Sequence, residues 1–394
     1  MENLPIVHVV NGRQKKLLQG HPWVYGNEIE RVEGEIEDGG LLTVVDFRGR
    51  YMGTGFYNSK SLITVRLLTH RQEEITDELI ASRVKAACDY RRFVMNRPGT
   101  DSCRLIYGEA DRLPGVIADR FGGVIVLQVL ALGMERFTQT IADALLACEK
   151  PDCLLLQNDD AIRRKEGMEC FTRVLYGTLP EENIIHENGV KLAVDVLGGQ
   201  KTGYFLDQKD NHLFVRQFCK DARVLDCFSY IGAFALNAAA AGAKEVTAVD
   251  ISEAAVQLIE KNAALNGADI TAVCANCFDF LRAQVKAGEK YDVVVLDPPA
   301  FTKAHANMAS ACRGYKEIAL SAMRLLPAGG VLATHSCSYH MPEEVFVNTV
   351  LSAAQDLHRQ VRVITLRRQD IDHPVLAGYP ESHYLKSLWL QMLD

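Results

Sequence analysis

The first part of the chain, up to about residue 70, contains short apolar runs separated by glycines and polar residues. Three of these runs cover residues 41–46, 51–56 and 62–68. Runs of this length, rich in β-branched residues and bounded by turn formers, are typical of strands. Because these runs follow one another so closely, we expect a small β-barrel.

The middle of the chain has a different pattern, in which longer segments with helical periodicity alternate with apolar runs. The charged segment 78–92 and the segment 134–148 predict helices. The apolar runs 115–119, 124–130 and 153–157 predict strands. We therefore expect a small mixed α/β unit here.

After about residue 186 the pattern is a regular alternation of apolar strands and helices. The predicted strands are 224–226, 245–250, 291–297 and 330–334, and the clearest helices are 254–266 and 314–326. Strands that are apolar throughout and alternate with helices indicate a parallel sheet covered on both faces. We expect a doubly wound α/β domain at residues 186–394, preceded by a β-barrel at 1–72 and an α/β connector at 73–185.

Composition and net charge exclude some classes of protein. The chain has 394 residues, of which 48% are hydrophobic and 24% charged, as in an ordinary folded protein. Its net charge of −7 excludes a protein that coats nucleic acid without specificity, so a nucleic-acid partner would need a local basic surface.

The distribution of cysteines and the length of the apolar segments indicate in which cellular compartment the protein works. The 11 cysteines are scattered without a dense framework, which predicts reduced, intracellular thiols. The first residues show no basic segment followed by an apolar core, and the most apolar stretch, 233–243, is far shorter than the roughly 20 residues of a membrane span. We expect a cytoplasmic protein with no membrane partner.

The first strand of the doubly wound domain ends at Asp226 and runs into a loop that contains Phe228, Ser229, Tyr230 and Gly232. A glycine after the first strand lets the backbone approach a ligand at the carboxyl edge of the sheet. The next strand ends in Asp250, an acid placed to bind the two hydroxyls of a ribose.

The same loop lacks the three glycines that seat a pyrophosphate, so we expect a nucleoside-type ligand. Asp226 would repel a phosphate but could orient a cationic amino-acid group, which points to S-adenosylmethionine. On these residues alone, a structural glycine turn in another doubly wound fold remains an alternative.

The sequence Asp297-Pro298-Pro299-Ala300-Phe301 follows a strongly apolar strand. The two prolines fix the backbone and remove two N–H donors beside the acid. An acid, two prolines and an aromatic residue at this place are typical of methyltransferases that act on planar nitrogen-containing rings.

Cys337, after the next strand, decides between two reactions on such rings. Methylation of an amino group needs no thiol, whereas carbon 5 of a pyrimidine becomes nucleophilic only after a thiolate adds to carbon 6. Asp297 could then assist at nitrogen 3 as charge builds there. The alternative is that Cys337 is a small buried hydrophobe, although serines and histidines surround it in sequence.

Motifs along nearly the whole chain resemble one family. The chain is similar to the PUA-domain-containing class I methyltransferases that form 5-methylcytidine in large-subunit ribosomal RNA. The resemblance rests on residues 20–25, 113–117, 163–167, 202–208, 297–299, 312–315, 336–338, 372–374 and 384–386.

The resemblance implies a fold, a reaction and a site. The fold would be a PUA-like barrel, a connector and a Rossmann-like methyltransferase domain, with large-subunit ribosomal RNA as partner and a homodimer as one option. Cys337 would be the nucleophile and Asp297 its partner. The residues expected to bind S-adenosylmethionine are Phe205, Gln208, Asp226, Phe228, Ser229, Tyr230, Gly232, Asp250, Ile251, Asn276, Cys277 and Asp297.

Two positions depart from related enzymes. Asn276 stands where many sites place an acid on the adenine amino group, and an amide oxygen can still accept a hydrogen bond there. Ala300 stands where a sister group carries a second cysteine for product release. Cys274 and Cys277 have the spacing of a metal pair, but no second pair follows, so we expect no metal.

RNA contacts are expected from basic and aromatic residues of the first two domains. The candidates are Arg13, Lys16, His21, Trp23, Arg163 and Arg164. The alternative for the first four is a solvated charged edge with Trp23 in the core. Two other functions stay open, namely methylation of a guanine nitrogen on the same scaffold and a non-catalytic RNA-binding assembly factor.

Overall fold

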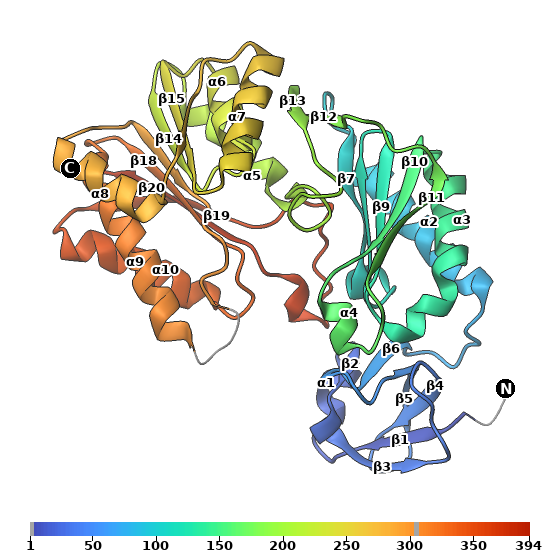
Figure 1. Cartoon of the computed structure of the whole chain (residues 1–394). Coiled ribbons are helices and arrows are strands. Elements are labelled where there is room, and N and C mark those ends of the chain that lie inside the picture. Colours follow the sequence, from blue (N-terminus) through green and yellow to red (C-terminus); the bar gives the residue numbers. More distant parts are fainter. Residues whose placement is uncertain (1–3, 303–306) are drawn as a thin grey trace.

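The computed structural model describes residues 4–302 and 307–394, whose strands form four sheets. The first sheet has the order β2-β6-β5-β4-β1-β3. Its strands are β1 (Ile6–Val9), β2 (Trp23–Val24), β3 (Ile29–Glu33), β4 (Leu41–Val45), β5 (Tyr51–Tyr57) and β6 (Val65–Thr69), with helix α1 (Gln14–Leu18) between the first two. This blue domain lies apart from the other sheets in Figure 1 and contains the three strands predicted for it.

The second sheet has five strands in the order β11-β10-β9-β8-β7. Its elements are α2 (Asp77–Val94), β7 (Ser102–Tyr107), β8 (Val116–Phe121), β9 (Val124–Val129), α3 (Thr138–Glu149), β10 (Cys153–Asn158), α4 (Ile162–Lys165) and β11 (Phe171–Gly177). Helices α2 and α3 pack on it through residues such as Ile80, Val84 and Ile141.

A small hairpin follows, made of β12 (Ile184–Glu187) and β13 (Val190–Ala193). Its residues Ile185 and Leu192 share one apolar core with Val126 of the second sheet and with Ile231 and Leu236 farther along the chain. A boundary between residues 185 and 186 would cut this hairpin. We therefore propose the three-domain division with the second boundary before β12 instead.

The last sheet has seven strands in the order β16-β15-β14-β17-β18-β20-β19. Its elements are α5 (Lys209–Val215), β14 (Arg223–Cys227), α6 (Ala233–Ala240), β15 (Glu245–Asp250), α7 (Glu253–Asn266), β16 (Thr271–Cys274), α8 (Cys277–Ala287), β17 (Val293–Leu296), α9 (Met308–Leu325), β18 (Val331–Ser336), α10 (Glu343–Asp356), β19 (Val361–Arg367) and β20 (Lys386–Met392). Neighbouring strands are parallel except that β20 runs antiparallel to both β18 and β19. The expectation of a doubly wound, mostly parallel sheet is confirmed.

Helices cover both faces of this sheet, because alternate residues of its strands enter two different cores. Leu225 and Leu296 pack with residues of α8, α9 and α10, whereas Val224 and Val295 pack with residues of α5, α6 and with Trp389. In the described part of the chain, no helix is long and apolar enough to span a membrane.

The C-terminal connection, which we define as residues 368–385 between β19 and β20, touches all three domains. It is the red segment that runs toward the other two domains in Figure 1. The backbone carbonyl of Asp372 accepts from Arg91 Nη2 of the middle domain at 2.9 Å. Gly378 lies so close to the first domain that a Cβ on it would be 2.2 Å from the carbonyl oxygen of Gln19. The connection then returns to the sheet beside Cys337.

Candidate active site

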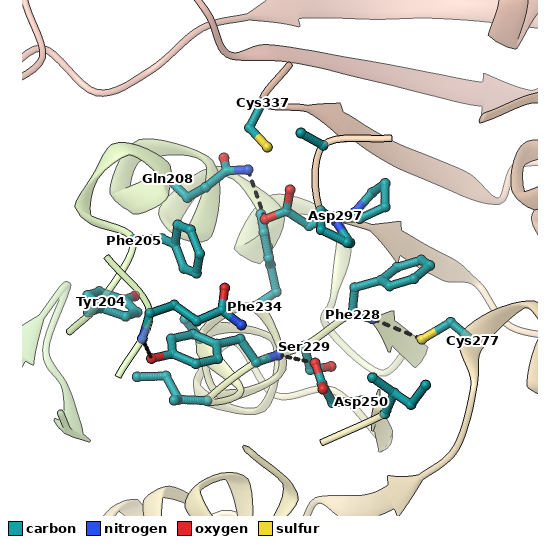
Figure 2. A pocket seen from close by; sticks show the side chains of 18 of the residues that line it. Tyr204, Phe205, Gln208, Phe228, Ser229, Phe234, Asp250, Cys277, Asp297 and Cys337 are labelled. Atoms are coloured by element: carbon teal, nitrogen blue, oxygen red, sulfur yellow. Dashed lines mark hydrogen bonds between the residues drawn. The ribbon is translucent and has the colours of Figure 1, made fainter. Parts of the chain in front are cut away.

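A cavity of about 810 Å³ opens at the carboxyl ends of β14, β15, β17 and β18. Open α/β sheets bind their ligands at this edge. Eleven of the residues predicted for the site line it together, as Figure 2 shows for most of them: Phe205, Gln208, Phe228, Ser229, Tyr230, Asp250, Ile251, Asn276, Cys277, Asp297 and Cys337. Asp226 and Gly232 are not among the lining residues.

The loop after β14 presents its backbone to the cavity in an unusual conformation. Phe228 has a φ of +62° and Tyr230 of +51°, in the left-handed region that glycine prefers, and Gly232 follows with +86°. The Phe228 N–H donates to Cys277 Sγ at 3.2 Å. Left-handed residues other than glycine cost free energy and concentrate at ligand sites. The surrounding contacts therefore hold this loop in a strained backbone conformation of the kind found at ligand sites.

Asp250 ends β15 with its carboxylate oriented by two backbone donors. Oδ2 accepts from Tyr230 N and Oδ1 accepts from Ser252 N, each at 2.9 Å. Each oxygen keeps a free lone pair, since a carboxylate has about four acceptor positions. The fixed carboxylate can therefore accept from two neighbouring hydroxyls of a ribose.

Asp226 has a structural role that the sequence did not predict. It is fully buried behind the loop, where Oδ2 accepts from Ala235 N at 3.1 Å and Oδ1 has no partner among the described residues. Burial raises its pKa to about 7. Asp226 thus braces the start of α6 from outside the lining of the cavity, and its contact with an amino-acid group stays a prediction.

Asn276, expected to accept a hydrogen bond from an adenine amino group, lines the cavity but also caps a helix. Its Oδ1 accepts from Phe278 N at 2.9 Å and from Asp279 N at 3.4 Å, which makes Asn276 the N-cap of α8. Asparagine is among the best N-cap residues because its short side chain reaches these unpaired N–H groups. Its amide oxygen is therefore engaged by the helix.

Acidic groups gather at the other end of the cavity. Gln208 Nε2 donates to Asp297 Oδ2 at 3.0 Å. Burial raises the pKa of Asp297 to about 7, and the negative charge of Asp207 acts in the same direction. Burial also acts to raise the pKa of Asp207, but Lys201, His373 and the Tyr384 hydroxyl outweigh it and hold that pKa below its usual range. Near neutral pH this end therefore combines a carboxylate with a carboxyl group that is half protonated.

Several lining residues were missed by reasoning from the sequence, among them Lys201, Tyr204, Asp207, His212 and Phe234. Four of the five precede β14, where no strand end marks them. His212 follows Gln208 by four residues, so the helical spacing was a signal that could have found it.

Cys337 lies directly after β18, with its sulfur toward Gln208 and Asp297 in Figure 2. The two serines beside it fix the loop, since Ser336 Oγ and Tyr315 OH are 2.8 Å apart and Ser338 Oγ donates to Thr302 O at 2.8 Å. Burial raises the pKa of the Cys337 thiol to about 11, while the positive charge of Lys201 acts to lower it. The free thiol is therefore protonated at neutral pH and needs cations to ionise.

The residues expected to contact RNA divide into exposed and packed ones. Arg13 and Arg164 are exposed, and Lys16 is partly exposed beside Glu28, with Nζ 2.6 Å from Oε2. His21 is buried against Glu381, and the half-buried Trp23 donates from Nε1 to Glu109 at 2.8 Å. The two rings thus join domains, and Trp23 lies at this contact half-buried rather than in the core.

For Arg163 the RNA expectation is wrong, because the side chain is fully buried. Its Nε donates to Glu169 O at 2.7 Å, Nη1 to Val129 O and Nη2 to Glu135 Oε1 at 2.6 Å. A guanidinium with these partners has no surface left for a phosphate. Arg163 holds α4 and the loop after it against the end of β9 and the segment that follows β9.

Replacing Arg163 with methionine is expected to lower the free energy of unfolding by roughly 1–3 kcal/mol, because the buried carbonyl of Val129 and the carbonyl of Glu169 lose their donor. Arg164→Met is the matched control, since its exposed side chain should change stability by less than about 0.5 kcal/mol. Denaturant unfolding of both variants measures the difference. Equal stability of the two variants would contradict the structural role of Arg163.

Comparison with known proteins agrees with this geometry. Residues 7–70 match the model of a PUA-like domain, and residues 125–369 match the model of an S-adenosylmethionine-dependent methyltransferase. Ribosomal RNA large subunit methyltransferase I of Klebsiella pneumoniae (strain 342) is 42% identical over 388 residues, which is 97% of each chain. The chain belongs to the ribosomal RNA large subunit methyltransferase I family.

Solved structures share the fold of this methyltransferase. A Streptococcus mutans protein assigned as an S-adenosylmethionine-dependent methyltransferase superposes with a TM-score of 0.84, at 20% identity, over 98% of this chain and 99% of its own. A methyltransferase solved with S-adenosylhomocysteine also gives 0.84, at 19% identity, over the same shares.

The cofactor of this methyltransferase is therefore S-adenosylmethionine, and the cavity fits it. Asp250 has an oriented carboxylate that can accept from ribose hydroxyls, and Phe228 and Ile251 line the cavity with apolar surface on which a purine can lie. Gln208, Asp207 and Asp297 line the other end, where acceptors and negative charge suit a cationic group. We propose these contacts for the cofactor. A volume of about 810 Å³ also leaves room for a flat substrate ring beside the cofactor.

Asp250→Asn is expected to weaken S-adenosylhomocysteine binding about 10- to 100-fold, because hydrogen bonds to a charged group are lost. The amide NH₂ would also face the N–H of Tyr230 or Ser252, which now donate to the carboxylate. Calorimetric titration measures the change, with Asp279→Asn on the exposed face of α8 as control. Unchanged binding in Asp250→Asn would show that the ribose lies elsewhere.

Proposed function

We propose that this methyltransferase forms 5-methylcytidine in large-subunit ribosomal RNA through a covalent bond from Cys337 Sγ to carbon 6 of the cytosine. The observation that carries the proposal is that Cys337 and Asp297 line the same cavity as the residues that fit the cofactor. A thiol is unnecessary for methylation of an amino group but required for carbon 5. The relatives are ribosomal RNA large subunit methyltransferases, which supplies the RNA class.

The residues of the chain would divide the work as follows. The Cys337 thiolate adds to carbon 6, and Asp297 in its protonated form donates a hydrogen bond to nitrogen 3, where negative charge develops. Bound S-adenosylmethionine supplies an electrophilic methyl group. Loss of the carbon-5 proton and of the Cys337 thiolate then restores the aromatic ring and frees the enzyme.

Contacts to RNA are proposed for Arg13, Lys16 and Arg164, which keep exposed surface. Such contacts hold a phosphate backbone without reading sequence. A base within folded RNA must be unstacked to reach a cavity at the edge of a sheet. His21 and Trp23 would act by joining the PUA-like domain to the rest of the chain.

Nucleoside mass spectrometry of ribosomal RNA tests the proposal. RNA from cells that lack the protein is treated with purified enzyme and cofactor, and then digested to nucleosides. We expect one additional 5-methylcytidine in the large-subunit RNA. A methylated guanosine in its place would establish guanine methylation, and no product together with no cofactor binding would indicate a non-catalytic assembly factor.

A further inference from the structure

A buried lysine lies next to the loop that carries Cys337. Lys386 is the first residue of β20 and pairs in register with Ser336, the residue before Cys337. Its side chain is only 3% exposed. Nζ donates to Ser338 O at 2.5 Å and to Tyr384 O at 2.7 Å. The ammonium thus ties Ser338, on one side of Cys337, to the end of the C-terminal connection, while strand pairing holds Ser336 on the other side.

A second buried lysine in the same chain shows what a structural ion pair looks like here. Lys209 Nζ lies 2.5 Å from Asp372 Oδ2 and 3.5 Å from Asp370 Oδ2. Among residues 4–302 and 307–394, no carboxylate oxygen lies within 4.0 Å of Lys386 Nζ. A buried ammonium without an anion costs free energy. Among the described residues, Lys386 therefore has no carboxylate as counter-ion.

The charged groups around Lys386 are few. Burial lowers its pKa to about 8, while Cys337 and Glu343 act in the opposite direction. Glu343 already faces His383 and Arg368, with Oε2 3.8 Å from His383 Nε2 and 3.9 Å from Arg368 Nε. Glu343 thus has two other cations nearby, and Cys337 is the second group whose negative charge acts on Lys386.

Charged groups of both signs act on the pKa of the Cys337 thiol. Lys201 acts to lower the pKa of the thiol, whereas Asp297 and Asp207 act to raise it. Lys201 is itself 3.3 Å from Asp207 Oδ2, so its charge is partly compensated. A thiolate at Cys337 would need a further cation. The ammonium of the buried Lys386, bound to the carbonyl of the next residue, Ser338, is in a position to provide it.

We propose that Lys386 is a positioning residue that holds the Cys337 turn through the carbonyl of Ser338 and serves as the counter-ion of the Cys337 thiolate. The inference rests on the proposed function, because only a thiol that ionises needs such a partner. The thiol proton passes to solvent base through the open cavity, and Lys386 keeps its own proton throughout.

The rate at which iodoacetamide alkylates Cys337 measures the fraction of thiolate. The rate is followed between pH 6 and 10 without RNA, by mass spectrometry of the peptide that contains Cys337. In Lys386→Met we expect an about 10-fold lower rate at pH 8, equivalent to a thiol pKa about one unit higher. Lys386→Arg keeps the charge and should stay close to the wild type.

Controls separate this role from a purely structural one. The exposed Cys274 in the same digest should react at the same rate in all variants, and Lys220→Met controls for removal of an exposed lysine. S-adenosylhomocysteine binding reports that the site is folded. Equal alkylation of Cys337 in wild type and Lys386→Met would overturn the proposal, while the proposed function would still stand on methyl transfer.

A second measurement does not depend on the lysine variants. In Cys337→Asp a permanent carboxylate takes the place of the thiolate. Nuclear magnetic resonance of labelled lysine side chains should then show Lys386 titrating at least one pH unit higher than in the wild type. An unchanged titration of Lys386 would contradict its role as counter-ion.

Discussion

Cys337→Ala is expected to lower the rate of methyl transfer by roughly four orders of magnitude or more, as the loss of a covalent nucleophile does in other enzymes. Without the thiolate, carbon 5 of cytosine is too weak a nucleophile to accept the methyl group. The rate is measured in single turnovers with saturating cofactor, so that binding does not contribute.

The control for this variant is Cys274→Ala, whose thiol is exposed and does not line the cavity. It should keep the wild-type rate. Cys337→Ala should bind S-adenosylhomocysteine as the wild type does, because the proposed ribose contact, Asp250, is elsewhere in the cavity. Retained transfer in Cys337→Ala would rule out the covalent mechanism and leave guanine methylation as the better explanation.

Asp297→Asn is expected to lower transfer about 10²- to 10³-fold and to change its pH dependence. The proposed mechanism requires Asp297 protonated and Cys337 ionised, although their pKa values of about 7 and about 11 stand in the opposite order. Below pH 7 the population of this form rises tenfold per pH unit with the thiolate. Between 7 and 11 the gain in thiolate is offset by the loss of the Asp297 proton.

The wild-type rate should therefore rise up to about pH 7 and then stay level. In Asp297→Asn the carboxyl no longer titrates, so the rate should continue to rise above pH 7 as thiolate forms. Asp279→Asn, on an exposed face of α8, is the control and should keep the wild-type profile. The same profile in Asp297→Asn and in the wild type would show that Asp297 does not work as the acid.

The parts of the fold that the sequence predicts are those with local signals. Four of the seven strands of the last sheet, β14, β15, β17 and β18, were predicted because they are apolar, whereas β16, β19 and β20 were missed. The residues at the carboxyl ends of the predicted strands, such as Asp250 and Asp297, meet by the geometry of parallel sheets. The hairpin β12–β13 is too short and too mixed to give such a signal. Its apolar residues become informative only when two domains close over them.

The parts that could not be predicted depend on contacts between distant residues. The Tyr384 hydroxyl donates to Asp207, which is 177 residues away in sequence. Arg163 looked like an exposed cation because its sequence neighbours are basic, but burial and three acceptors decide its role. Asn276 was predicted to bind adenine, whereas its side-chain oxygen accepts hydrogen bonds from the first turn of α8.

The most direct test of the covalent mechanism uses ribosomal RNA that contains 5-fluorocytidine. Fluorine at carbon 5 cannot leave as a proton does, so the adduct with the enzyme persists after methyl transfer. We expect a protein–RNA complex that survives denaturation, and mass spectrometry of its digest should place the nucleotide on Cys337. No stable complex, or a nucleotide on another cysteine, would contradict the account.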